Sequence, residues 1–319
     1  MTAPPGSAVS VEVIFLSLLM ASVSAQEAPQ FRVDVQLINV AASVRNASGQ
    51  LVADLTQDDF EILEDGVPQR IRAFARRTDT PLNLGLVVDA SGSQRKFFRR
   101  HRRDLERFLE GVIQPRDRAF LLCFGNHLRL VSDSTASIEQ IMDNMERYDD
   151  GKLAGFPKLG PPDEIREAGT ALYDAVFYAS EEKLRETERG RRALVIFSDG
   201  EENSSAHDLL DAITAAQQND ATIYAIRYTD AKPSKVTARN KHGIRSMHHL
   251  AGHTGGADYD AEAKGMKETF RAIGEELRSS YELGYISSNE VRDGAFRKIT
   301  VRLKRPGLTA RAKPGYFAR

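Results

Sequence analysis

The pattern of hydrophobic and polar residues changes twice along the chain. Residues 31–44 place apolar side chains at nearly every second position, which is typical of a strand with one buried face. Between residues 81 and 279, short apolar runs alternate with segments in which apolar residues recur at helical spacing. Residues 280–319 return to strand-like patterns. The sequence therefore predicts an α/β part between two β segments.

The α/β part is expected to form one doubly wound, Rossmann-like domain. Its repeated order of strand and helix implies a mainly parallel sheet with helices on both faces. The loop at residues 148–168 is long, and loops of this length inside a compact domain are usually functional or mobile. The expected strands cover residues 82–88, 119–124, 127–131, 194–198 and 222–228, and the expected helices cover residues 96–112, 138–145, 171–184, 209–218 and 264–277, with one more that ends at Gly255-Gly256.

The two flanking segments predict a second, smaller domain. Residues 58–66 fit a strand that ends in an Asp-Gly turn, and residues 69–76 are expected to be its partner strand. Neither flanking segment buries enough surface to be stable alone, so we expect them to pair into a β-sandwich-like domain. The expected boundaries are residues 26–79 and 280–319 for the two β segments and residues 80–279 for the α/β domain.

The first 25 residues are expected to be a secretory signal peptide. Residues 13–23 are almost continuously apolar, and the small residues Ser24 and Ala25 follow them. The run is too short for a comfortable transmembrane helix. Residues 1–10 contain no Lys or Arg and Glu12 borders the run, so an uncleaved anchor or a misassigned start site stays open as an alternative. The prediction is a secreted or periplasmic protein with no membrane span after cleavage.

Composition narrows the classes of function. The chain has 319 residues, which suggests about two domains. Its formal net charge of −1 gives no general attraction to nucleic acid or to membrane surfaces. The one cysteine, Cys123, lies in an apolar run and can form no internal disulfide, so we expect it to be a small buried hydrophobe.

Oxygen-bearing side chains follow the first strand of the α/β part. That strand stops at Asp89, and Ser91 and Ser93 come next, with Gly92 allowing a tight backbone turn between them. In an open α/β sheet, ligands bind at the carboxyl ends of the strands. A carboxylate and two hydroxyls are hard donors, which suit Mg²⁺, Mn²⁺ or Ca²⁺.

Two further segments place the same kind of donor at the same edge. Thr170 opens the helix expected at residues 171–184, and the strand at residues 194–198 runs into Asp199-Gly200. If both strands are central and parallel, their carboxyl ends lie roughly 5 Å apart. Three hydroxyls and two carboxylates then converge, which leaves an octahedral cation with positions open to water and to an outside ligand.

This order of residues resembles the metal-ion-dependent adhesion site of von Willebrand factor A domains, which integrins also carry. The resemblance covers about residues 81–279. It implies one divalent cation, Mg²⁺ or alternatively Mn²⁺ or Ca²⁺, bound by the three hydroxyls and, directly or through water, by the two aspartates. A carboxylate from a protein partner would complete the coordination shell. Glu201-Glu202, directly after Asp199-Gly200, adds negative charge that strengthens cation binding or discourages an acidic ligand.

The flanks resemble those of secreted bacterial proteins that carry this domain. Before it stands the segment Asp59-Phe-Glu-Ile-Leu-Glu-Asp-Gly66, and after it the segment Tyr281-Glu-Leu-Gly-Tyr285. By this resemblance the chain is expected to be an exported, non-enzymatic binding protein that captures an acidic side chain of a protein partner. The oligomeric state stays open.

Other interpretations of the same residues stay open. Asp89, Ser91 and Ser93 are also the residue types that form turns and cap helices. A bound metal that only holds the loops together would make the protein a scaffold. A metal-dependent phosphohydrolase is the most distant alternative, because Ser91 stands where a haloacid-dehalogenase-type enzyme needs a second Asp. Neither a Gly-x-Ser-x-Gly elbow at Ser91 nor a phosphate-binding loop is present.

A basic cluster and a histidine cluster each have a simpler explanation than a functional site. The cations from Arg95 to Arg103 lie in the first turns of a helix, where they oppose the helix dipole. They either attract an acidic partner or form a solvated helix face, and the second interpretation is favoured. His249 and His253 are four residues apart, but no Glu lies between them to act as the base of a zinc protease. Together with His248 they are expected to be surface or capping histidines.

Overall fold

The structure, a computed structural model, describes residues 37–77, 80–125, 127–160, 169–187, 190–229, 237–263 and 265–318. The expected signal peptide lies outside the described residues, as does the start of the strand expected at residues 31–44. Within the described part, no helix is both long enough and apolar enough to cross a membrane.

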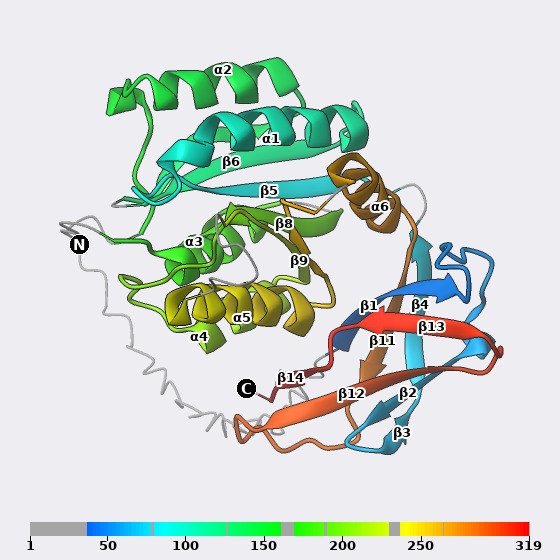
Figure 1. Ribbon diagram of the computed structural model, residues 1–319. Helices are drawn as coiled ribbons and strands as arrows, with labels where there is room; N and C mark the ends of the chain where they lie inside the picture. The colour runs from blue at the N-terminus through cyan, green and yellow to red at the C-terminus, as the bar shows by residue number, and fades with distance from the viewer. Residues whose placement is uncertain are drawn as a thin grey trace, which may run out of the picture. The chain divides into compact units, whose positions relative to one another are not determined.

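A six-stranded sheet forms the centre of the α/β part (Figure 1). Neighbouring strands are parallel, except that the last one pairs antiparallel with its neighbour. The apolar runs form the strands because both faces of the sheet are buried. The order across the sheet is β10 (Asp258–Asp260), β9 (Ala221–Arg227), β8 (Arg191–Ser198), β5 (Leu82–Asp89), β6 (Arg118–Phe124) and β7 (Arg129–Thr135).

Helices cover both faces of this sheet, which confirms the doubly wound fold. Alternation along β5 sends Leu84, Leu86 and Val88 into one core and Val87 into the other. The first core is closed by α1 (Phe98–Val112), α2 (Ile138–Asp149) and α6 (Met266–Arg278), and the second by α3 (Leu172–Tyr178), α4 (Leu209–Gln218) and α5 (Ala238–His253) (Figure 1).

Short helical segments extend this framework. The helix expected at residues 171–184 is present as α3 followed by a π-helical turn at Ala179–Leu184. The long loop before it contains a 3₁₀ turn at Leu153–Gly155. Two further 3₁₀ turns, Gln57–Asp59 and Arg95–Phe97, precede β2 and α1.

The flanking segments form two four-stranded antiparallel sheets, as the sequence predicts. Each sheet combines strands from both ends of the chain, and the apolar faces of the two sheets share one core. One sheet has the order β13 (Leu308–Ala312), β1 (Leu37–Asn46), β11 (Ser280–Ile286) and β4 (Ile71–Arg77), and the other β14 (Gly315–Phe317), β12 (Phe296–Leu303), β2 (Phe60–Glu64) and β3 (Val67–Gln69). Residues Gln36–Arg319 form one compact unit, so the expected domain boundaries stay a prediction.

One expected strand pairing is wrong. The Asp65-Gly66 turn after β2 is present, with φ of 49° and 86°. However, of the segment expected to pair with β2 only the short strand β3 does so, while β4 crosses to the other sheet and pairs with β11. The crossing carries Phe74 into the shared core, where its ring centroid lies 5.8 Å from that of Phe60 on β2. Burial of this aromatic side chain favours the crossing over a longer hairpin.

Helix α6 connects the two parts of the fold through a buried carboxylate. Glu276, whose side chain is 2% exposed, accepts a hydrogen bond from the Ser43 hydroxyl of β1 at 3.1 Å. It also pairs with Arg45 of β1 at 3.1 Å and with Arg311 of β13. Burial alone would raise the pKa of Glu276, but the two guanidinium groups outweigh it and hold the pKa below its usual value.

Candidate metal centre

The carboxyl ends of β5 and β8 lie side by side at one edge of the central sheet. The two strands are parallel neighbours, with Val88 opposite Phe197. Asp89 ends β5, and Asp199 follows directly after β8. The expectation that these two strands are central and adjacent is therefore confirmed, and this adjacency brings the two aspartates to the same edge.

Asp89 is fully buried and accepts hydrogen bonds on both carboxylate oxygens. One oxygen accepts the backbone N–H of Ser91 at 2.9 Å, and the other accepts the Ser198 hydroxyl at 2.6 Å. Burial, together with the smaller effect of the Asp199 charge, raises the pKa of the Asp89 carboxyl to about 7 against the opposing effect of its hydrogen bonds. Asp89 is thus a buried acid in surroundings that disfavour its charge.

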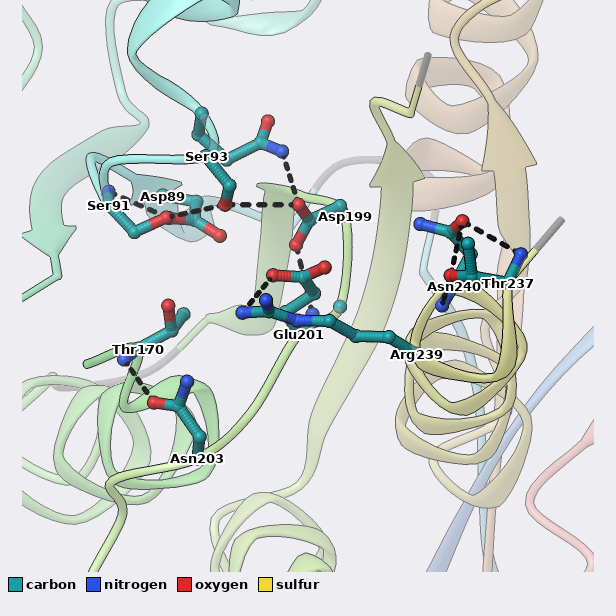
Figure 2. Close-up of polar contacts among 12 residues, drawn as sticks. Asp89, Ser91, Ser93, Thr170, Asp199, Glu201, Asn203, Thr237, Arg239 and Asn240 are labelled. Carbon is teal, nitrogen blue, oxygen red and sulfur yellow. Dashed lines mark hydrogen bonds and ion pairs between the residues drawn. The ribbon is translucent and has the colours of Figure 1, made fainter. Parts of the chain in front are cut away.

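The two serines connect Asp89 to Asp199. The hydroxyls of Ser91 and Ser93 lie 3.1 Å apart, and the Ser93 hydroxyl donates to Asp199 at 3.2 Å (Figure 2). Asp199 also accepts a hydrogen bond of 2.6 Å from the side-chain amide of Gln94. Four of the five residues singled out in the sequence therefore lie in one hydrogen-bonded network.

Thr170 lies at the same edge but is attached to it differently. Its backbone N–H donates to the side-chain oxygen of Asn203 at 2.8 Å, and the Asn203 backbone N–H donates back to the Thr170 carbonyl at 3.1 Å. Asn203 belongs to the loop that follows Asp199, so this pair holds Thr170 beside that loop. Figure 2 shows the Thr170 side chain on the side that faces Asp89 and Ser91.

The two acidic residues after Gly200 have different surroundings. Glu202 accepts hydrogen bonds from the backbone N–H groups of Ser204 and Ser205, each at 2.8 Å, and from that of Tyr173 at 3.0 Å. Its charge is thus used to order the loop and the start of α3. Glu201 instead lies against Asp199, and burial followed by the Asp199 charge raises its pKa.

The donor set suits a hard divalent cation. Across the described ranges, neither Asp89 nor Asp199 forms an ion pair with a basic side chain, so a cation would compensate charge that the protein leaves unpaired. Within those ranges, no three His, Cys, Asp or Glu side chains converge as a metal site, so any site at this edge depends on hydroxyl oxygens. Hydroxyl and carboxylate oxygens favour Mg²⁺, Mn²⁺ or Ca²⁺ over softer metals.

Some members of this arrangement were missed from the sequence. Gln94 directly follows Ser93, and Ser198 directly precedes Asp199. An amide or a hydroxyl at these positions has no distinctive sequence signal. Asn203 lies in a polar loop of turn-forming residues, where any of several side chains fits the pattern equally well. Contact with Thr170 becomes visible only after β8 and α3 are packed together.

The basic cluster at residues 95–103 and the histidine cluster at residues 248–253 make contacts outside the candidate metal centre. Arg99 at the start of α1 is exposed, whereas Arg100 pairs with Glu262 and Arg102 pairs with Glu146 at 3.4 Å. His248 contacts Asp258 at 2.9 Å, and the rings of His249 and His253 lie 5.6 Å apart. The role of the basic cluster stays a hypothesis.

Gly200 gives a stability prediction for the turn that carries Asp199. It has φ +79°, and a Cβ there would overlap the carbonyl oxygen of Gly243 in α5. Gly200→Ala is expected to lower the free energy of unfolding by about 2 kcal/mol or more, because strain and overlap add. Gly151→Ala, at φ +77° with no atom within 4 Å, is the strain-only control. Equal losses in urea titrations of the two variants would contradict this account.

Comparison with known proteins gives one family match. The chain matches the model described as von Willebrand factor type A domain over residues 83–255. No curated protein sequence matches the chain. Among solved structures, BatB from Bacteroides thetaiotaomicron is similar at 15% identity, with a TM-score of 0.44 over 61% of this chain and 97% of that chain.

Two other solved structures show the same distant level of similarity. A von Willebrand factor type A protein from Catenulispora acidiphila has 10% identity and a TM-score of 0.48, covering 90% of this chain and 74% of that chain. The manganese-loaded TRAP protein of Plasmodium vivax has 11% identity and a TM-score of 0.46, covering 79% of this chain and 97% of that chain. At this distance they carry no inference about function.

Proposed function

The chain belongs to the von Willebrand factor type A domain family, and from this premise we propose that it is an exported protein that captures an acidic group of a protein partner through a divalent cation. Domains of this family serve mainly in interaction and not in catalysis. The proposal assigns Asp89, Ser91, Ser93, Thr170 and Asp199 to the cation.

The observation that carries the proposal is the network from Asp89 through Ser91 and Ser93 to Asp199. It joins oxygen donors from two neighbouring strands at the edge where open α/β sheets bind ligands. The buried, unpaired charge of Asp89 supports a cation there, since burying an uncompensated carboxylate is costly.

A divalent cation bound there supplies a Lewis-acidic position for an outside carboxylate. The protein's own groups have the tasks of holding and orienting that ion. Gln94 fixes one oxygen of Asp199, Ser198 fixes one oxygen of Asp89, and Asn203 fixes the backbone of Thr170. Such supporting hydrogen bonds keep the donor atoms directed at a common point.

An acidic partner is favoured because a hard divalent cation with an open coordination position binds carboxylate oxygens well. The exposed cations Arg95, in the 3₁₀ turn that follows Ser93, and Arg99, in the first turn of α1, would draw a negatively charged surface toward this edge. Mg²⁺ is the proposed ion, with Mn²⁺ as the alternative.

Export is proposed from the sequence alone. The apolar run at residues 13–23 and the small residues after it support a cleaved signal peptide and a secreted or periplasmic location. N-terminal sequencing of the protein recovered from culture medium or periplasm would test this, with a mature start near Gln26 expected.

A scaffold with a structural metal is the second candidate. The hydrogen bonds of Asp199 to Gln94 and Ser93 already tie the two loops together, so an ion added there also strengthens that connection. The two functions differ in what a chelator removes: the scaffold loses thermal stability, whereas the capture protein loses its partner as well.

Partner capture with and without chelator tests the proposed function. The purified protein and its Asp199→Ala variant are used as bait in native extract, in Mg²⁺ or in EDTA. We expect a protein that binds only the wild type in Mg²⁺, with at least a tenfold loss in EDTA and in the variant. A thermal gain in Mg²⁺ without any chelator-sensitive partner would favour the scaffold. Turnover of phosphoesters that Asp89→Asn abolishes would favour the enzyme.

A further inference from the structure

An arginine from helix α5 reaches a buried carboxylate at the edge of the candidate metal centre. A guanidinium nitrogen of Arg239 lies 2.7 Å from a carboxylate oxygen of Glu201. The Glu201 side chain is 8% exposed and the Arg239 side chain is 64% exposed. Figure 2 shows the Arg239 side chain extended from α5 to the Glu201 carboxylate beside Asp199. A cation that belongs to the protein is therefore directed at the site proposed for the metal.

The packing of α5 holds this arginine in position. Gly243 of α5 and Gly200 approach so closely that a Cβ on either would overlap the other segment's backbone. Thr237 and Asn240 form a capping box that fixes the start of the helix, with the Asn240 N–H donating to the Thr237 hydroxyl at 3.2 Å. Arg239 stands between these two residues, so the same contacts that place α5 place its side chain above Glu201.

Charge explains why an arginine is present there. A cation in the first turn opposes the helix dipole and is mildly unfavourable for α5 itself. Across the described ranges, the charge of Asp199 acts on both Asp89 and Glu201, and of these three carboxylates Glu201 is the one with an ion-pair partner. Arg239 thus supplies part of the positive charge that the edge requires.

Resting on the proposed function, we propose that Glu201 is a further member of the metal centre and that Arg239 competes with the divalent cation for its carboxylate. Glu201 faces the ion directly or through a water molecule once Arg239 has left. Because one cation replaces the other, metal loading releases Arg239 into solvent, and the Arg239–Glu201 pair sets how tightly the centre holds its ion.

Manganese titration of the full chain by calorimetry tests this competition. The variants are Arg239→Gln, Glu201→Gln and the two combined. Arg245→Gln, on an exposed position of the same helix, is the matched control for loss of one positive charge. Arg239→Gln is expected to bind Mn²⁺ roughly tenfold more tightly than wild type, because it removes a repelling charge and frees Glu201. Glu201→Gln is expected to bind roughly tenfold more weakly.

The double variant separates competition from an indirect effect. If Arg239 acts through Glu201, adding Arg239→Gln to Glu201→Gln changes the Mn²⁺ affinity by less than twofold. Arg239→Lys retains the charge and is expected to stay near wild type, which guards against a general packing defect. Melting curves in EDTA for each variant confirm that it is folded.

Two results would overturn the inference, and they are distinguishable. If wild type binds Mn²⁺ but Arg239→Gln binds it equally or more weakly, the competition is absent while the metal centre stands. If wild type and Asp199→Ala both fail to bind Mn²⁺, the proposed function fails and the inference fails with it. Arg245→Gln tightening binding as much as Arg239→Gln would reduce the effect to bulk charge and would also contradict the inference.

Discussion

Asp89→Asn is expected to stabilise the metal-free protein and to abolish its stabilisation by Mg²⁺. The side chain of Asp89 is 0% solvent-accessible, and burial is the main cause of its raised pKa. The ionised carboxylate therefore carries a desolvation cost in the metal-free protein. The asparagine has the same shape and can still accept the Ser91 N–H while donating to the Ser198 hydroxyl. Removing a buried charge in this way is expected to add about 1–3 kcal/mol to the free energy of unfolding in EDTA near pH 8.

The same substitution removes a ligand of the proposed ion. Wild type at a Mg²⁺ concentration about 1,000 times its dissociation constant is expected to gain about 4.1 kcal/mol, and Asp89→Asn is expected to gain nothing. The order of stability of the two proteins therefore reverses between EDTA and Mg²⁺. This reversal is measurable as a crossing of their melting temperatures.

A matched variant controls for loss of charge alone. Asp143→Asn removes an exposed carboxylate from α2 and is expected to follow wild type within about 0.5 kcal/mol in both buffers. If Asp89→Asn were less stable than wild type in EDTA, its carboxylate would be stabilising the fold by its hydrogen bonds. If Asp89→Asn kept the Mg²⁺ gain, Asp89 would not belong to the metal centre.

Glu276→Gln is expected to cost about 2–4 kcal/mol of unfolding free energy, because it leaves two half-buried guanidinium groups without their buried carboxylate. Glu276 is 2% exposed and contacts Arg45 and Arg311 from the β part while belonging to helix α6 of the α/β part. Its loss therefore weakens the connection between the two parts. The measurement is the urea midpoint together with its slope.

The neighbouring residue provides the control for this prediction. Glu275 is 49% exposed and pairs with Arg271 one helical turn away, so Glu275→Gln is expected to cost less than about 0.5 kcal/mol. A loss for Glu276→Gln as small as that of Glu275→Gln would mean that the buried ion pairs contribute nothing beyond their desolvation cost.

The pH dependence of the Glu276 effect has a definite sign. The folded pKa of Glu276 lies below its ordinary value of 4.5. Its stabilisation is therefore fully present above that value and is lost as the pH falls through the folded pKa. The difference between wild type and Glu276→Gln is expected to be constant from pH 6 to 8 and to shrink below about pH 4.5. A difference that grew on acidification would contradict the assignment.

The fold was largely predictable because its signals are local. Apolar runs such as the one before Asp89 predict buried strands, and their alternation with helical segments predicts the doubly wound sheet. The Asp65-Gly66 turn was also predictable, since its two residues adopt the left-handed conformation that such a turn requires. The departure of β4 from β2 was not predictable, because it depends on the packing of Phe74 against the core that the two sheets share.

The candidate site likewise has residues that the sequence predicts and contacts that only the folded structure shows. Asp89, Ser91 and Ser93 are close in sequence, and a sheet rule places Asp199 beside them once β5 and β8 are known to be neighbours. Thr170 was expected at the same edge, but its attachment through Asn203 was not. Gln94 was passed over because a glutamine in a turn has many possible partners, and only the folded chain directs it at Asp199.

The sequence by itself determined the alternating framework and the order of oxygen donors at its strand ends, since both follow from spacing along the chain. Only the tertiary structure decided that Arg239 lies on Glu201, because that contact depends on the packing of α5 against Gly200. It also decided that Glu202 accepts backbone N–H groups and orders its loop. Two adjacent acids with the same chemistry received different roles because packing, and not residue type, set which carboxylate faces the site.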